Sequence, residues 1–375
     1  MNIYNKFKLD KKLLIYLFIF MIISMLTIYS AMTYLPDYLG NLALKQGIWY
    51  IIGFFVTFLV VKFKNELFYK QALFIYFSCC FLLLLLLFIG VDINGSKCWF
   101  VIPKVGSIQP SEFMKIGIIL LSSIITSKFS KIKKHSFKEE VIYLLKMFII
   151  FIIPSILTFL EPDTGSVLIY FIIIFTNILF SNLRKRYFIF LLVFFIIFGT
   201  AFLYLYIFQE DLLINIVGEN IFYRINRILD FLNGTGFQLE ISLTSVISSG
   251  FFGHGYNKTP VYFPESGTDF IFSVFASNFG LLGTFLLFSL IVCFDFHLIN
   301  ISSMCKDLTN KYVVLSTIAM LIFGQVQNIS MTLGLLPIMG IPLPFISYGG
   351  SSLISYMILI GIILNIYNEE KHQIH

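Results

Sequence analysis

Long apolar runs separated by short polar segments are the main pattern of this 375-residue chain. Each run holds roughly the 17–25 residues that an α-helix needs to cross the hydrocarbon core of a bilayer. The pattern predicts ten spans, at about 13–32, 46–62, 72–90, 113–128, 141–160, 165–182, 187–208, 270–296, 312–336 and 343–366. We therefore expect an all-α polytopic membrane protein that forms a single domain over residues 1–375.

Lysine and arginine residues fall in every second segment between these runs. They lie before the first run and in the connections from the second to the third, fourth to fifth, sixth to seventh and eighth to ninth runs. Because basic residues mark the cytoplasmic side of a membrane protein, both termini are predicted to be cytoplasmic. The first run, Leu13 to Met32, has no small-residue cleavage site, so we expect it to be retained as a helix.

Composition supports a membrane protein and removes other classes. Hydrophobic residues make up 58% of the chain, and charged residues make up 12%, about half the usual share of a soluble domain. The net charge of +6 does not indicate nucleic-acid binding, because the basic residues lie in the short segments that set topology. The cysteines and histidines show no metal-ligand spacing, so the sequence specifies no metal site.

Two outer segments are too long to be simple turns. One covers Val91 to Glu112, and the other covers about 209–268, between the seventh and eighth spans. The second segment includes apolar stretches at 212–217 and 241–247 that suit the membrane interface. Loops longer than about 12–15 residues are usually functional or disordered, so the outer side is where we expect the chemistry.

Charged residues at the edges of two spans are the first candidates for that chemistry. In FPESGTDFIF, Glu265 and Asp269 stand at the mouth of the eighth span, where a charge is costly and therefore functional by default. The alternative for Asp269 is a helix cap. In QPSEFMK, Lys115 follows Glu112 by three positions on one helical face. This pair is either functional or a modest structural contact.

Three further stretches carry unusual polar residues. Asp163 lies in the turn EPDTG, where ordinary turn chemistry is the alternative. Arg224, Arg227 and Gln238 lie in the long outer segment, and arginine suits phosphate and carboxylate groups, although a solvated surface explains them equally well. Ser347 belongs to GIPLPFISYGGSS, whose small residues favour close helix packing or a binding concavity.

The order of these motifs resembles one family. QPSEFMK, PDTG, FPESGTDFIF and PLPFISYGGSS, each at an outer membrane edge, are similar to the SEDS family of bacterial membrane proteins, which includes RodA, FtsW and SpoVE. The NISMTLGLLPIMGIPLPFISYGG region is closer to the RodA branch. The resemblance implies ten spans and a peptidoglycan glycosyltransferase that polymerises lipid II in the cytoplasmic membrane, for elongation and cell shape. It also implies a class B penicillin-binding protein as partner.

The resemblance also implies roles for individual residues. The essential acidic residue of the family falls on Asp269, which we expect to be the general base. Burial raises the pKa of such a carboxyl group and a nearby lysine lowers it. The substrate-binding or cavity residues are predicted to be Glu112, Lys115, Lys97, Trp99, Asp163, Arg224, Arg227, Gln238, Glu265 and Ser347. A divalent cation, Mg²⁺ or Mn²⁺, is expected from the family alone.

The chain departs from the family pattern at three places. Cys98 replaces one basic residue before Trp99, Glu161 replaces a glutamine before Pro162-Asp163, and Ser277-Asn278 replaces a pair of glutamates. These changes affect the finer substrate contacts.

Two other functions remain open from the sequence. A flippase for lipid-linked precursors would need polar residues deep in several spans, whereas most charges here lie at outer edges. A non-catalytic scaffold that activates a transpeptidase would not need the Asp269 motif. A role in division or sporulation is an alternative to elongation.

Overall fold

The computed structural model of the chain describes residues 9–32, 40–93, 96–102, 106–132, 134–189, 197, 200, 204, 209, 237–259 and 265–373. Among these residues, eight helices are long and apolar enough to cross a membrane. They are α1 Lys11–Met32, α2 Leu42–Lys62, α3 Asn65–Ile89, α4 Pro110–Ser130, α5 Phe137–Leu160, α11 Ile271–Met304, α12 Leu308–Thr332 and α13 Gly350–Gln373. The membrane-helix fold predicted from the apolar runs is therefore confirmed.

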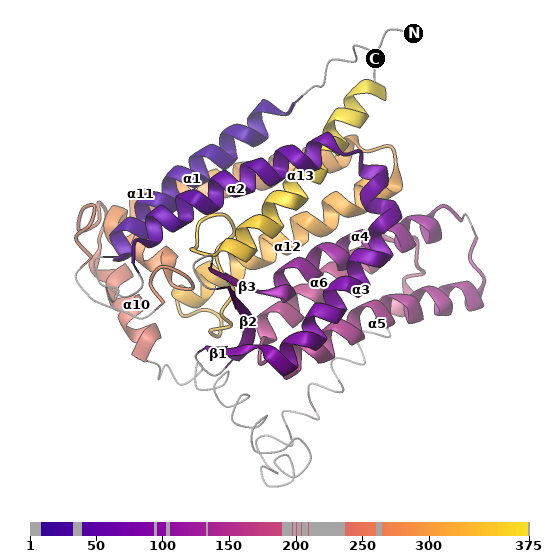
Figure 1. Cartoon of the computed structure of the whole chain (residues 1–375), viewed down its shortest axis with the longest axis horizontal. Helices are drawn as coiled ribbons and strands as arrows, with labels where there is room; N and C mark the ends of the chain where they lie inside the picture. Colours follow the sequence, from indigo (N-terminus) through magenta and orange to yellow (C-terminus); the bar gives the residue numbers. More distant parts are fainter. Residues whose placement is uncertain are drawn as a thin grey trace.

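Two shorter helices also have defined bounds. The apolar helix α6, Thr164–Phe180, corresponds to the predicted sixth span, and α10, Phe237–Ser248, includes the apolar stretch predicted at 241–247. Most of the predicted seventh span at 187–208 lies outside the described residues, and all of the stretch at 212–217 does. In Figure 1, α1 begins and α13 ends at one end of the bundle, while α10 and the strands lie toward the other.

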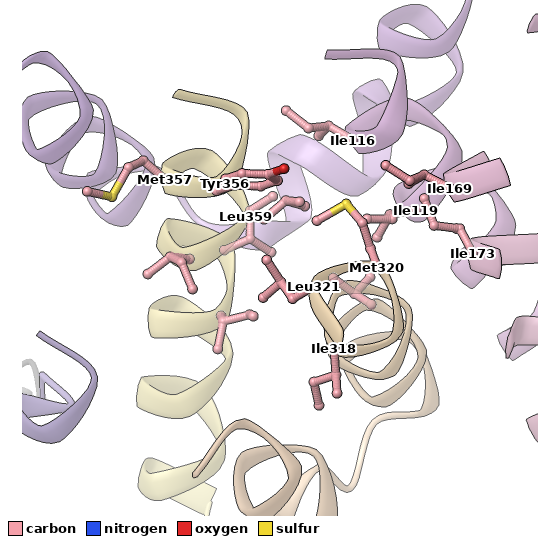
Figure 2. Close-up of a cluster of buried hydrophobic side chains, with 14 of the residues drawn as sticks. Ile116, Ile119, Ile169, Ile173, Ile318, Met320, Leu321, Tyr356, Met357 and Leu359 are labelled. Carbon is pink, nitrogen blue, oxygen red and sulfur yellow. The ribbon is translucent and has the colours of Figure 1, made fainter. Parts of the chain in front are cut away.

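Helices α4, α12 and α13 form the centre of the bundle, and α1, α2, α3 and α5 expose apolar faces. Figure 2 shows the isoleucine, leucine and methionine side chains of α4, α6, α12 and α13 that meet in the core. The central helices are also rich in buried serine and asparagine. Small residues let helix backbones approach closely, and polar side chains find partners between helices, so these sequences favour the interior over lipid.

A small antiparallel sheet connects α3 to α4 in the first long outer segment. Its strands are β1 Val91–Ile93, β2 Ser96–Ile102 and β3 Gly106–Ile108, in the order β1-β2-β3. Val91 pairs with Trp99, and Phe100 pairs with Ile108. The sheet adds a feature that the all-α prediction did not include. We call the end of the bundle that carries it the sheet end.

The last span begins later than predicted. We expected it at 343, but α13 begins at Gly350, and residues 340–349 form an irregular segment. Pro342 and Pro344 cannot donate backbone hydrogen bonds and disfavour a helical residue before them. Backbone carbonyls of this segment accept hydrogen bonds from other elements instead, from Tyr50 to Phe345 and from Ser24 to Ile346 at 2.7 Å. Irregular backbone in a membrane protein needs such partners.

Helix α11 is interrupted at Gly280, where φ is +64° and ψ is −162°. The loop after α10 fills the interruption with four backbone hydrogen bonds. These are His254 N to Ser277 O, Gly255 N to Asn278 O, Leu281 N to Gly250 O and Leu282 N to Phe251 O, at 2.9 to 3.2 Å. A Cβ on Gly253 would lie 2.3 Å from Asn278 O, so the approach requires glycine. The helix segment that follows Asp269 is therefore a separate short piece.

Candidate active site

Asp269 lies in a tight turn directly before α11. Phe270 N and Thr268 N both donate to Glu265 O at 3.1 Å, and the Thr268 hydroxyl donates to the Glu265 carboxylate at 2.7 Å. Glu265 has a φ of +56°, which lets the chain reverse within this turn. The N-cap of α11 is Phe270, without a side-chain cap. Asp269 does not cap the helix, so the structure does not support the capping alternative.

The carboxyl group of Asp269 has a pKa raised to about 7. Removal from water is the main cause, followed by the negative charges of Glu265 and Asp163. The residue keeps part of its surface exposed. A carboxyl group with this pKa is ionised in roughly half of the molecules at neutral pH and still accepts a proton readily, which suits a general base.

Glu112 and Lys115 form a buried ion pair at the start of α4. The Lys115 ammonium lies 2.5 Å from a Glu112 carboxylate oxygen, and both side chains are at most 5% exposed. The Ser355 hydroxyl donates to the same oxygen at 3.3 Å, and the ammonium lies 5.1 Å from the centre of the Tyr356 ring. The pair predicted from the spacing is present, and it ties α4 to α13. The expected lowering of the Asp269 pKa by Lys115 is not observed.

Asp163 connects the QPSE motif to α6. One carboxylate oxygen accepts from Ser166 N at 2.9 Å and caps α6. The other accepts from the side chains of Gln109 and Ser111 at 2.9 Å, and from the Ser166 hydroxyl at 2.7 Å. Ordinary capping explains only the first contact. The PDTG turn also approaches the segment beside Asp269: a Cβ on Gly165 would lie 2.7 Å from Met339 O, and one on Gly340 would lie 3.6 Å from Asp269 Oδ2. The folded chain therefore brings the QPSE, PDTG and FPESGTDFIF motifs to one place.

Two departures from the family pattern contact each other. The Cys98 thiol on β2 donates to the backbone oxygen of Glu161 at 2.7 Å. The Glu161 side chain is fully buried, and neither carboxylate oxygen has a hydrogen-bond partner among the described residues. Burial, with a smaller effect of Asp163, raises the pKa of Glu161 to about 8. This residue is therefore mostly neutral at pH 7, which the sequence alone did not reveal.

Ser347 holds the turn that carries Asp269. Its hydroxyl donates to Thr268 O at 2.6 Å and accepts from Leu343 N at 2.8 Å. Tyr348 N donates to Gly267 O at 2.9 Å. The irregular segment 340–349 therefore supports this turn through Ser347 and Tyr348. Asn328 of α12 also donates to Asp269 O, and the sequence analysis did not single it out; the available signal was the cluster of amide side chains at 325–328 within a predicted span.

The other predicted site residues that are described lie on β2 and α10. Lys97 is exposed on β2, Trp99 is half-buried on the same strand, and Gln238 is half-buried on α10. Arg224 and Arg227 lie outside the described residues.

The divalent cation expected from the family would need a group of ligand side chains. Among the described residues, no group of three or more histidine, cysteine, aspartate or glutamate side chains is arranged to hold a metal ion. The described part of the chain therefore shows no preformed metal site built from such side chains.

Comparisons with known proteins identify the family. The model of the FtsW/RodA/SpoVE family, described as "Cell cycle protein", matches residues 10–372. The chain is 34% identical to "Peptidoglycan glycosyltransferase MrdB" of Helicobacter pylori, over 87% of this chain and 83% of that protein.

Solved structures share the fold at lower identity. A chain from a structure described as "Structural coordination of polymerization and crosslinking by a peptidoglycan synthase complex" is 24% identical with a TM-score of 0.80, covering 96% of this chain and 98% of that one. The rod shape determining protein RodA of Thermus thermophilus is 24% identical with a TM-score of 0.69, covering 98% and 99%. Because the family model matches nearly the whole length of this chain, the chain belongs to the FtsW/RodA/SpoVE family, also called SEDS.

Proposed function

We propose that this protein is a peptidoglycan glycosyltransferase that polymerises lipid II into glycan strands. The observation that carries the proposal is the partly buried carboxyl group of Asp269, whose pKa is about 7, where three family motifs meet. A relative that is 34% identical carries the same activity in its name. The site residues lie at the starts of α4, α6 and α11, toward the end of the bundle that carries the sheet (Figure 1), and this position supports chemistry on a lipid headgroup near the membrane edge.

Asp269 acts as the general base in this proposal. Its carboxylate takes the proton from the acceptor sugar hydroxyl as that oxygen attacks the anomeric carbon of the donor sugar. The bond from the anomeric carbon to the pyrophosphate oxygen breaks, and the lipid pyrophosphate leaves with the electron pair. Asp163 and Glu265 raise the basicity of Asp269 by placing negative charge near it.

The leaving pyrophosphate needs positive charge close to it. Lys115 is poorly suited to this role, because its ammonium is fully buried against Glu112. Lys97, whose side chain is exposed, is the better candidate among the described residues. Arg224 and Arg227 lie outside the described residues and stay candidates from the sequence, because arginine suits phosphate groups. The Mg²⁺ or Mn²⁺ ion expected from the family stays a prediction; it would neutralise the same charge.

The proposal includes a topology and a partner. Both termini are cytoplasmic and the sheet end faces outward, as the distribution of lysine and arginine predicts. A class B penicillin-binding protein crosslinks the strands, a pairing in keeping with the synthase complex that contains a structural neighbour. The cellular role is elongation and cell shape.

A polymerisation assay with purified lipid II tests the proposal. The protein is assayed with its partner, and the wild type is compared with Asp269→Asn. Polymer from the wild type and none from a folded variant is the expected result. Polymer from Asp269→Asn at the normal rate would refute the assignment of the base. If neither protein makes polymer, a lipid-scrambling assay on the same preparation separates a flippase from a scaffold.

A further inference from the structure

The side chain of Asn328 on α12 holds two backbone carbonyls at the site. Its Nδ2 donates to Asp269 O and to Ile341 O, each at 2.8 Å, and the residue is fully buried. Both carbonyls belong to non-helical backbone: one lies in the turn before α11, and the other lies in the irregular segment 340–349. A single amide nitrogen therefore satisfies two acceptors that no helix satisfies, using both of its hydrogens.

The orientation of this amide is fixed by the two carbonyls. With Nδ2 facing both acceptors, Asn328 Oδ1 has no hydrogen-bond partner among the described residues. A buried acceptor without a donor is unfavourable, and an apolar side chain of the same volume would avoid that cost. Packing alone does not account for asparagine at this position. The hydrogen bonds to the two carbonyls account for it.

One of the two tethered segments lies against the Asp269 carboxylate. Gly340, directly before Ile341, has a φ of +66°, and a Cβ placed on it would lie 3.6 Å from Asp269 Oδ2. Asn328 therefore links the backbone of Asp269 to the very segment that lies against its carboxylate. Catalysis by a general base depends on its placement, and a displacement of about 1 Å reduces rates by around 100-fold.

We propose that Asn328 is a positioning residue for Asp269. It joins the turn that carries the base to the segment 340–341, so that the carboxylate is held at the place where the acceptor hydroxyl binds. Because its bonds are to backbone, it sets the position of the base and makes no contact with substrate. This inference rests on the proposed role of Asp269 in glycosyl transfer.

Asn365 on α13 provides a matched control. Its Nδ2 also donates to two backbone carbonyls, Val60 O at 3.0 Å and Phe63 O at 2.7 Å, and it is 4% exposed. These carbonyls lie at the end of α2 opposite the sheet end. Asn365→Leu thus removes the same number and kind of bonds as Asn328→Leu, but away from the site.

The experiment measures kcat and KM for lipid II polymerisation by the full chain with its partner, below the unfolding temperature of every variant. We expect Asn328→Leu to reduce kcat by about 10- to 100-fold while KM stays within about twofold. Asn365→Leu should lose comparable thermal stability yet keep kcat within about twofold. Equal kcat values for the two leucine variants would overturn the proposal.

A second variant keeps the test decisive if Asn328→Leu does not fold. Asn328→Asp has the shape of asparagine and, when protonated, retains one of the two hydrogen bonds. Its kcat should lie about tenfold below that of the wild type and, where Asn328→Leu folds, above the kcat of that variant. A wild-type kcat in Asn328→Asp would overturn the proposal. An active Asp269→Asn variant would instead overturn the proposed base, so the two failures are distinguishable.

Discussion

The buried pair of Glu112 and Lys115 gives the sharpest stability prediction. Their charged atoms are 2.5 Å apart and both side chains are at most 5% exposed, so removal of either partner leaves an unpaired charge in the core. Breaking such a pair costs about 3–5 kcal/mol, whereas replacing both members with neutral side chains is often close to neutral. We therefore expect Lys115→Met and Glu112→Gln each to destabilise the protein by about 3–5 kcal/mol.

The double variant separates pairing from packing. Glu112→Gln keeps an acceptor for the Ser355 hydroxyl, and methionine keeps the length of the lysine stem. The combination should be more stable than either single variant, with a coupling energy of at least about 2 kcal/mol. Equilibrium unfolding in detergent, followed by the fluorescence of the chain's two tryptophans, Trp49 and Trp99, measures these values.

An exposed pair in the same protein is the control. Lys70 and Glu66 are 3.9 Å apart on α3, with side chains 75% and 78% exposed. Lys70→Met should change the free energy of unfolding by less than about 0.5 kcal/mol, because water and salt screen such pairs. If Lys115→Met costs no more than Lys70→Met, or if the double variant loses the sum of the single losses, the reasoning from burial is wrong.

Three further predictions concern the site and the loop after α10. The rate of polymerisation should fall as pH drops through about 7, because Asp269 becomes protonated. Asp163→Asn removes a nearby negative charge and should shift this fall to lower pH; an unchanged pH–rate profile would contradict an effect of Asp163 on Asp269. Glu161 has a folded-state pKa of about 8, above its ordinary value of 4.5, so wild-type stability should decline between about pH 4.5 and 8. Glu161→Gln should remove most of that decline when unfolding is measured across this pH range. If the stability of the variant falls with pH as much as that of the wild type, Glu161 is not the cause. Gly253→Ala should unfold at a clearly lower temperature than Gly250→Ala, since both require positive φ but only Gly253 has a backbone atom 2.3 Å from the added Cβ.

Most of the helical framework could be predicted from the sequence. The thickness of the bilayer fixes the length of a span, so apolar runs gave the described helices to within several residues at most ends. The sequence also indicated Asp269, Glu112, Lys115 and Asp163 as candidates, because a charged residue at the end of an apolar run is costly and is visible in the sequence. The ion pair of Glu112 and Lys115 followed from their spacing on one helix.

The contacts between distant segments could not be predicted. The interruption of α11 at Gly280 depends on a loop that supplies its missing hydrogen bonds, and the irregular segment 340–349 depends on donors from α1 and α2. The partners of Asp269 are likewise a matter of packing, since its charge environment comes from Asp163 and Glu265 and not from Lys115.

The sequence by itself determined that this is a membrane-helix protein of one family and which carboxylates stand at the ends of apolar runs, because span length and the cost of charge are local properties. Only the tertiary structure decided how the turn with Asp269 is held. Asn328 is 59 residues from Asp269 along the chain, and no periodic pattern connects them. The hydrogen bond forms because packing of the helices places the buried Asn328 amide beside two backbone carbonyls that have no helical partners.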